Sequence, residues 1–227
     1  IEDGTSGDNY IYMQRGNKVS LFYAGAEKLA TTSTGIDVTG IVVSDGMSTN
    51  TSGTSNFIAG VNAGNSIASG GNYNVVVGDE AGTAITTGDS NTGVGFGAVK
   101  AATTGSQNVG IGVNALATVT TASYNTALGT SALTANTSGA NNVAVGTNAL
   151  EANTTGPYNT AVGSDAGASV TTGDSNTLLG EAAGDAITVG ADNTALGRDA
   201  LGADTQGSSS IAIGRNALAS QNFTSPT

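Results

Sequence analysis

The sequence predicts an all-β protein in which a short antiparallel β-meander precedes a parallel β-roll, or β-solenoid, of about ten coils. A unit of 17 residues recurs from residue 56 almost to the last residue, and each unit contains a β-prone triplet such as "VAV", "TAL" or "IAI". Glycine stands at two corners of the unit, which leaves no room for a useful helix but suits two short strands and two turns. Coils stacked at the usual strand spacing make a rod about 45–50 Å long.

The N-terminal region, residues 1–40, lacks the repeat and has the pattern of a meander. Its expected strands lie near residues 9–14, 18–23, 27–32 and 36–39. Its expected turns lie at Gly16-Asn17, Gly25 and Gly35. A joint rich in Ser, Thr and Gly follows over residues 41–55, and the roll takes up residues 56–227.

The sequence at each end of the chain predicts how the segment continues or is covered. The chain begins at Ile1 with neither an initiator Met nor a signal peptide, so we expect a processed chain or a segment of a longer protein. The last coil has no evident cap, and we expect a further domain or a partner to cover it.

The opening Asn of the repeat serves as position 0 for counting. It returns every 17 residues, Ser210 takes its place in the last unit, and Asn56 precedes the regular series by 18 residues, so one residue is inserted there. The regular openers are Asn74, Asn91, Asn108, Asn125, Asn142, Asn159, Asn176 and Asn193. Stacked at one corner, their side-chain amides are expected to form a ladder from coil to coil.

Gly occupies position 4 and Ala occupies position 7 of every unit. The glycines are Gly60, Gly78, Gly95, Gly112, Gly129, Gly146, Gly163, Gly180, Gly197 and Gly214. The alanines are Ala63, Ala81, Ala98, Ala115, Ala132, Ala149, Ala166, Ala183, Ala200 and Ala217. A buried Ala lets two layers of the coil approach closely, where a larger residue would collide. A further Gly at position 14, often within "TTG" or "TSG", is expected to supply a turn with positive φ.

Three other positions bear on surface chemistry. Position 3 is apolar in every unit, position 12 is Thr in eight successive units from Thr86 to Thr205, and Tyr73, Tyr124 and Tyr158 each precede an opener. The Thr hydroxyls either form a hydrogen-bonded ladder or contribute to an ice-binding face. Such faces usually need two parallel ranks, whereas the adjacent Thr here should point to the other side. The tyrosines either shield the edge between coils or stack against the apolar faces of sugars.

Composition excludes several classes of function. With 17 acidic and 6 basic residues the net charge is -11, which leaves no basic stripe for nucleic acid and disfavours anionic membranes. No run of about 18 apolar residues is present to insert into a bilayer. His and Cys are absent, so nucleophilic catalysis with a His base, disulfides and thiolate metal sites are excluded. We expect no catalytic residues, no metal site and no cofactor.

The acidic residues are expected to be solubilising charges in turns. They include Asp79, Glu80, Asp165, Glu181, Asp185, Asp199 and Asp204. No acidic residue lies between Asp89 and Glu151, which argues against the paired carboxylates of a glycosidase. An ion held on a trimer axis by rings of Asn or Asp stays open as an alternative.

The interior of one coil is small. Each coil supplies only two or three sizeable interior side chains, which bury little apolar area against the entropy of ordering 17 residues. Several chains that share one core would relieve this shortage. We therefore expect an oligomer.

The pattern N-x-x-x-G-x-x-A, with cores such as "NVAVGTNAL" and "SIAIGRNAL", resembles the head repeats of trimeric autotransporter adhesins over residues 56–218. Those repeats are usually a few residues shorter, and the additional residues here lie in the "TTG" turn. The resemblance implies a left-handed roll and a homotrimer packed around an axis. In the N-terminal region, "EKLATTSTGIDVTG" is similar to a segment common in tail-fibre and other structural proteins of marine bacteriophages.

Together these resemblances imply an attachment fibre of a phage virion, a rigid trimeric rod that is part of the extracellular tail. The expected partners are further copies of the chain, other virion tail proteins, and a glycan or protein of the host surface. No enzymatic activity is expected. One alternative is the head of a bacterial trimeric surface adhesin, which would continue into a coiled-coil stalk and a membrane anchor. Another is an ice-binding β-solenoid, which would be monomeric with a flat Thr face.

Overall fold

The computed structural model describes residues 10–14, 18–24, 26–31, 36–38 and 51–223. The chain divides into two compact units between Met47 and Ser48. Regular structure in the described residues consists of strands alone, arranged as one antiparallel and one parallel sheet. The predicted class, an all-β chain with a meander followed by a parallel solenoid, is confirmed.

The first unit is a four-stranded antiparallel sheet in sequence order. Its strands are β1 (Tyr10–Gln14), β2 (Lys18–Tyr23), β3 (Ala26–Thr31) and β4 (Ile36–Val38). These bounds agree with the predicted ranges to within one residue, and the predicted turns at Gly16-Asn17, Gly25 and Gly35 lie outside the described residues. Ser20 and Ala30 pair across β2 and β3 and are buried, whereas Val19 and Leu21 on the opposite face are exposed. This alternation is typical of a sheet with one covered face.

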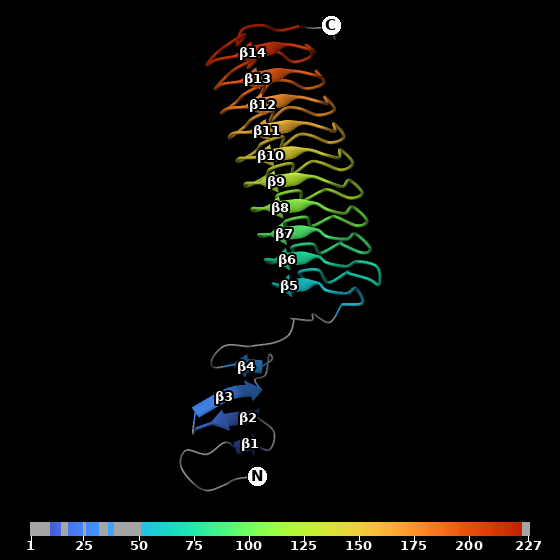
Figure 1. The fold of residues 1–227 in the computed structure, drawn as a ribbon, viewed down its shortest axis with the longest axis vertical. Helices are drawn as coiled ribbons and strands as arrows, with labels where there is room; N and C mark the ends of the chain where they lie inside the picture. Colours follow the sequence, from blue (N-terminus) through green and yellow to red (C-terminus); the bar gives the residue numbers. More distant parts are fainter. Residues whose placement is uncertain (1–9, 15–17, 25, 32–35, 39–50, 224–227) are drawn as a thin grey trace. The chain divides into compact units, whose positions relative to one another are not determined.

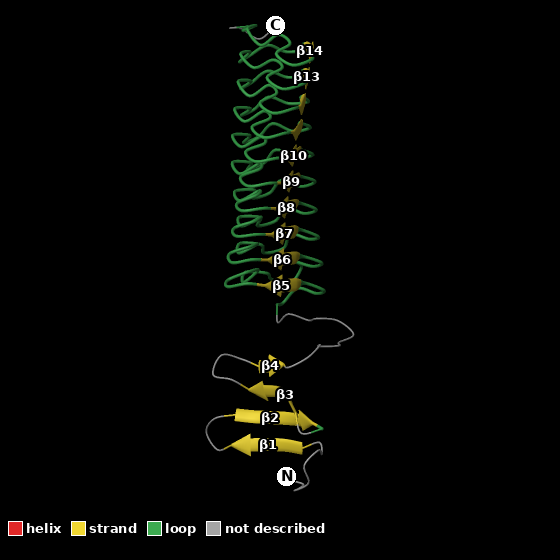
Figure 2. Cartoon of the chain, turned by 90° about the vertical axis from the view of Figure 1, so that its left-hand side faces the viewer, coloured by secondary structure: helices red, strands yellow, loops and turns green. Residues whose placement is uncertain are grey.

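The second unit is a parallel roll with one three-residue strand in each coil. The strands are β5 (Phe57–Ala59), β6 (Val75–Val77), β7 (Thr92–Val94), β8 (Val109–Ile111), β9 (Thr126–Leu128), β10 (Val143–Val145), β11 (Thr160–Val162), β12 (Thr177–Leu179), β13 (Thr194–Leu196) and β14 (Ile211–Ile213). They form one ten-stranded sheet in strict sequence order, and Figures 1 and 2 show them stacked in a single column along the roll.

The inserted residue of the first unit lies in a turn and leaves the strand register intact. The first residues of β5 and β6 pair directly although they are 18 residues apart. Ala68 N–H donates to Thr86 O at 2.9 Å, as Thr86 N–H donates to Thr103 O one coil later. The additional residue therefore follows Ala68, in the turn that contains Gly70.

One expectation about the coil is wrong, because each described coil contains one strand and not two. Positions 5 to 16 run through turns in which φ is repeatedly positive, as at Ser131, Leu133 and Asn141 of a single coil. Left-handed residues at positions 6 and 8 interrupt any extended run there, and the chain continues through turns and bends up to position 13. Bonds from coil to coil continue there all the same, as from Leu133 N–H to Ala149 O at 3.0 Å.

The interior of the roll is closed within a single chain. Position 2, at the centre of each strand, is buried in β6 through β14, and positions 1 and 3 face outward. The position-7 alanines are fully buried from Ala81 to Ala200, as predicted, and Ala63 is 7% exposed. One apolar cluster extends from Ala63 to Ala212. An oligomer must therefore rest on the outer surface of the roll.

Candidate binding surfaces of the roll

The Asn column is a buried corner of the roll. Oδ1 of Asn142 accepts a hydrogen bond from the N–H of Asn159 in the next coil at 2.8 Å, and Nδ2 of Asn142 donates to Gly156 O in its own coil at 2.9 Å. The predicted amide-to-amide ladder is only partial, since Nδ2 reaches the preceding Asn at Asn108 and Asn125 (3.1 and 3.2 Å) and at Asn176 (3.0 Å). Because these side chains face the interior, they cannot ring an ion between chains.

Glycine is needed at the two corners for different reasons. At position 4 φ lies between +114° and +141°, and a Cβ at Gly95 would lie 2.6 Å from the carbonyl oxygen of Gly112. At position 14 the expectation of positive φ is wrong, since none of these glycines has a φ in the left-handed region. A Cβ at Gly139 would instead lie 2.6 Å from Gly156 O of the next coil. Close stacking selects Gly at position 14, and Ala122 is a local exception.

The Thr column at position 12 forms a ladder along the roll, as one of the two interpretations predicted. Thr86 Oγ1 donates to Thr103 O at 2.9 Å, and the same bond continues in each coil until Thr188 Oγ1 donates to Thr205 O at 2.8 Å. Position 13 is the more exposed neighbour in most coils. The hydroxyls of position 12 are thus committed to the backbone, and position 13 alone presents an outward rank.

The outer sheet face, defined as positions 1 and 3 of β5 to β14, is uncharged along the whole roll and apolar at position 3. Ile111, Leu128 and Leu196 at position 3 are 37%, 46% and 45% exposed. Position 1 beside them holds Thr, Val, Ile or Phe, and neither position carries a charge in any of the ten described strands. The outer sheet face is therefore an uncharged stripe as long as the roll.

The three tyrosines predicted as surface contacts lie at position 16 with exposed rings. Tyr73, Tyr124 and Tyr158 are 63%, 58% and 62% exposed, and their φ values are +58°, +63° and +59°. Their backbones belong to the regular stack, since Tyr158 N–H donates to Ala140 O of the preceding coil at 3.1 Å. The rings remain accessible, as stacking against a sugar requires.

One acidic residue departs from the expectation of a solubilising charge. Asp204 at position 11 is fully buried, and its Oδ1 accepts hydrogen bonds from the N–H groups of Gln206, Gly207 and Phe223 at 3.3, 2.8 and 3.3 Å. Its Oδ2 has no partner. Asp204 thus caps the turn of the last complete coil, where the corresponding turns are capped by Asn136 and Asn153.

Four other acidic residues of the C-terminal coils lie partly or fully exposed at positions 5, 6 and 9, namely Asp165, Glu181, Asp185 and Asp199. Burial raises the pKa of Asp185, the charges of Asp199 and Asp165 raise it further, and hydrogen bonds from two backbone amides oppose the shift. Arg198 pairs with Asp199 and Glu181 at 3.1 and 3.6 Å. Among the described residues no group of three or more His, Cys, Asp or Glu side chains could hold a metal ion.

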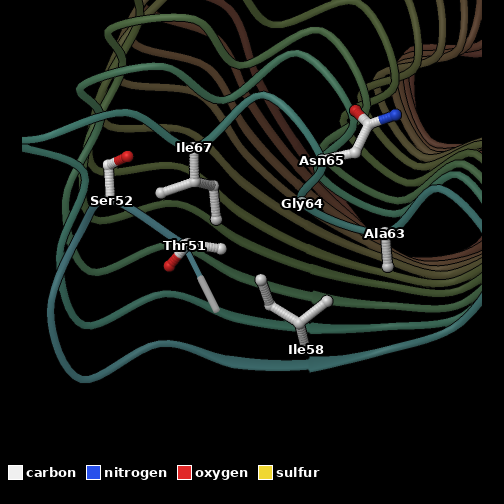
Figure 3. A pocket seen from close by; sticks show the side chains of 7 residues that line it. All are labelled: Thr51, Ser52, Ile58, Ala63, Gly64, Asn65 and Ile67. Carbon is white, nitrogen blue, oxygen red and sulfur yellow. The ribbon is translucent and has the colours of Figure 1, made fainter. Parts of the chain in front are cut away.

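The N-terminal end of the roll contains a hollow of about 400 Å³. It is lined by Thr51, Ser52, Ile58, Ala63, Gly64, Asn65 and Ile67. Figure 3 shows Ile58 and Ile67 pointing into it from opposite walls, and these residues hold the interior positions 2 and 11 of the first coil. Residues 51–55 continue the stack as positions 12 to 16 of an incomplete coil, since Tyr73 N–H donates to Thr54 O at 3.0 Å. Within the described residues of the roll, the hollow is thus the N-terminal end of the core.

The part of the chain that the structure describes contains no helix that could cross a membrane. No family model matches the chain, and no curated protein and no solved structure matches it. What the molecule establishes is its architecture, a four-stranded antiparallel sheet followed by a parallel β-solenoid of nine turns between ten strands.

Proposed function

We propose that this chain is a structural segment of an extracellular attachment fibre, in which three copies form a rigid rod that projects from a phage tail. The observation that carries the proposal is the unbroken residue-on-residue register of the ten parallel strands. Nine strand spacings separate the first strand from the last by about 43 Å. The Asn and Thr columns add side-chain bonds to the backbone bonds at each step, which stiffens the rod.

The outer sheet face supports self-association. Its position-3 side chains form a row of apolar residues, several of them exposed, and a long exposed apolar row is typical of an interaction surface. Three parallel copies would bring the same position of each coil together around a common axis, and the absence of charge from positions 1 and 3 makes such self-contact free of like-charge repulsion. The resemblance to trimeric adhesin heads favours three copies.

The N-terminal segment "EKLATTSTGIDVTG" favours a phage tail over a bacterial surface, since its resemblance is to tail-fibre and other phage structural proteins. In that setting the other partners are virion tail proteins and a component of the host surface. A bacterial adhesin head is the second candidate, and the repeat itself supports it equally well. An ice-binding role lacks support from geometry, because the hydroxyls of the position-12 Thr column donate within the roll.

Light scattering on the purified chain tests the oligomer. A mass three times 21.9 kDa is expected, and the double variant Ile111→Asp/Leu128→Asp should dissociate because two charges enter the outer sheet face. Val189→Asp is the matched control, since Val189 is 44% exposed at position 13, outside that face. A folded monomer in the unmodified chain would overturn the trimeric rod, and a trimer that survives the double variant would place the contact elsewhere.

A further inference from the structure

We infer that the tyrosine edge of the roll, the position-16 column that contains Tyr73, Tyr124 and Tyr158, binds an extended, uncharged polysaccharide. The inference rests on the proposed attachment function, for which it names the class of ligand. It requires only that the rings be accessible and does not depend on how many chains form the rod.

The three tyrosines lie at a position where the other coils fold without an aromatic residue. Every residue at position 16 has a positive φ, and the other coils fill the position with small or polar side chains. These are Ser55, Ser90, Gln107, Asn141, Ser175, Asp192 and Ser209. A left-handed backbone disfavours a bulky ring far more than it disfavours Asn or Asp. An aromatic ring at these three positions is therefore not a requirement of the fold.

The rings also contribute nothing to the core. All three are more than half exposed, whereas the interior of every coil is filled from positions 0, 2, 7, 8 and 11. A Tyr ring presents an apolar face for stacking and a hydroxyl for hydrogen bonding, the combination that a pyranose, with its apolar face and equatorial hydroxyls, can match. The side chains are therefore free to bind a ligand without loss of fold.

Their spacing matches an extended chain and not a compact ligand. Tyr73 and Tyr124 are three coils apart and Tyr124 and Tyr158 are two coils apart, on one edge of one stack. At one strand spacing per coil these separations are about 14 and 10 Å along the roll. A polysaccharide presents sugar faces at regular intervals along a line, so several rings can engage a single chain at once, and weak contacts then add through effective concentration.

The surroundings of the rings select an uncharged ligand. Ser90, Gln107 and Asn141 stand between the tyrosines at position 16, and hydroxyl and amide groups of this kind can hydrogen-bond sugar hydroxyls. The charges on this edge are acidic, at Asp89 and Asp174 among others, and positions 13, 15 and 16 carry no Lys or Arg in the described roll. With a net charge of -11, the chain repels sulfated or carboxylated glycans and nucleic acids.

Native electrophoresis of the full chain in gels that contain hydroxyethyl cellulose, galactomannan or α-mannan tests the inference. The unmodified chain should be retarded in at least one of these gels and should not be retarded by dextran sulfate. The variant Tyr73→Ser/Tyr124→Ser/Tyr158→Ser uses the residue that other coils place at position 16, so the fold should persist. Its apparent affinity for the polysaccharide should fall by about tenfold or more. The corresponding Phe variants should retain most of the binding.

Phe96→Thr is the matched control, because Phe96 is an aromatic residue 50% exposed at position 5, away from the tyrosine edge, and Thr occupies that position in other coils. Its retardation should equal that of the unmodified chain. The inference is overturned if no neutral polysaccharide retards the chain, if the Ser variant is retarded equally, or if only dextran sulfate binds. It is also overturned if the Ser variant loses its oligomeric mass, since the rings would then join copies. A monomer that still binds through its tyrosines would overturn the trimeric rod alone.

Discussion

Two coils of the roll, residues 74–90 and 125–141, have the same outline and different interiors. Both open with a buried Asn, turn at Gly in position 4 and bury an Ala at position 7. In the first coil Val76 and Ile85 fill the interior from positions 2 and 11, and position 8 is Gly82. A Cβ at Gly82 would lie 2.5 Å from Val76 Cγ1 and 2.8 Å from Ile85 Cδ1, so that coil has no room for a larger side chain at position 8.

In the second coil the bulk stands at position 8. Leu133 is fully buried there, Ala127 takes position 2 and Asn136 takes position 11. The same exchange holds in every coil, since Gly at position 8 is accompanied by Ile or Val at position 11, and Leu or Val at position 8 is accompanied by Ala or Gly at position 2. The comparison separates two kinds of constraint. The Asn, Gly and Ala columns at positions 0, 4 and 7 keep nearly one residue type from coil to coil. The residues at positions 2, 8 and 11 vary, but together they fill the same space inside the coil.

Asn159→Ala should cause the largest loss, because it removes a member of the buried Asn column, a feature that both coils share. The N–H of Asn176 and the carbonyl of Gly173 would lose their partners inside the roll. At about 1–3 kcal/mol for each buried unsatisfied group, the free energy of unfolding should fall by roughly 2–6 kcal/mol. Urea denaturation followed by circular dichroism measures the change. Thr147→Ala, at an exposed position 5, is the control, and a loss no larger than that of the control would mean that the Asn column does not hold the coils together.

Leu133→Gly tests the shared volume directly. Loss of the buried Leu should lower the free energy of unfolding by about 2–5 kcal/mol, the range for large cavities. Adding Ala127→Val and Asn136→Ile converts the coil to the composition of residues 74–90 and should restore most of the loss. The same denaturation experiment compares the single and triple variants. Equal stability of the two would show that the interiors are not interchangeable and would break the comparison.

The columns could be predicted from the sequence because repetition marks them. Burial of the Ala column, the stack of Asn corners and the presence of one inserted residue between the first two units all follow from spacing and residue size. The number of strands did not follow, because Leu at position 8, as in Leu133 and Leu150, has a left-handed backbone that its own propensity disfavours. Stacking on the next coil imposes that conformation, and a single unit read alone does not contain the information.

The surfaces were harder to predict than the fold. Asp204 was expected in solvent because acidic residues are seldom buried, and only the three N–H groups converging on its Oδ1 explain its place. Tyr158 was compatible with shielding or with exposure, since residue type fixes neither. The exchange among positions 2, 8 and 11, in contrast, is visible in the sequence once the inward positions are known.

Thr154→Val should have a smaller effect, because it removes one hydroxyl from a column and preserves its shape. Thr154 Oγ1 donates to Thr171 O at 3.1 Å, and loss of such a bond should lower the free energy of unfolding by about 1 kcal/mol. Thr155→Val is the matched control at position 13, which is exposed and where Val189 occurs naturally. If the two variants lose equal stability, the hydroxyl of Thr154 contributes no more than that of an exposed Thr, and the Thr column does not stabilise the roll.

Asp185→Asn should have the smallest effect, since position 9 lies on a corner that neither stacking nor shared volume constrains. Burial, assisted by the charges of Asp199 and Asp165, raises the pKa of Asp185 in the folded chain. A raised carboxyl pKa means that the folded state holds this proton more tightly, so the associated stability is full below the ordinary Asp pKa and is lost as pH rises through the folded pKa. Asp185→Asn should therefore be more stable than the unmodified chain at neutral pH, and this difference in the free energy of unfolding should disappear in acid.

Glu151→Gln removes one charge from the same position of another coil and is the control for that difference. Urea midpoints at neutral and acid pH give the comparison. A difference at Asp185 that persists in acid, or an equal one at Glu151, would assign the effect to overall net charge. A difference in stability that is found only for Asp185→Asn, and only at neutral pH, would show that local charges govern the stability of this corner. The repeated columns and the interior packing would then have no part in it.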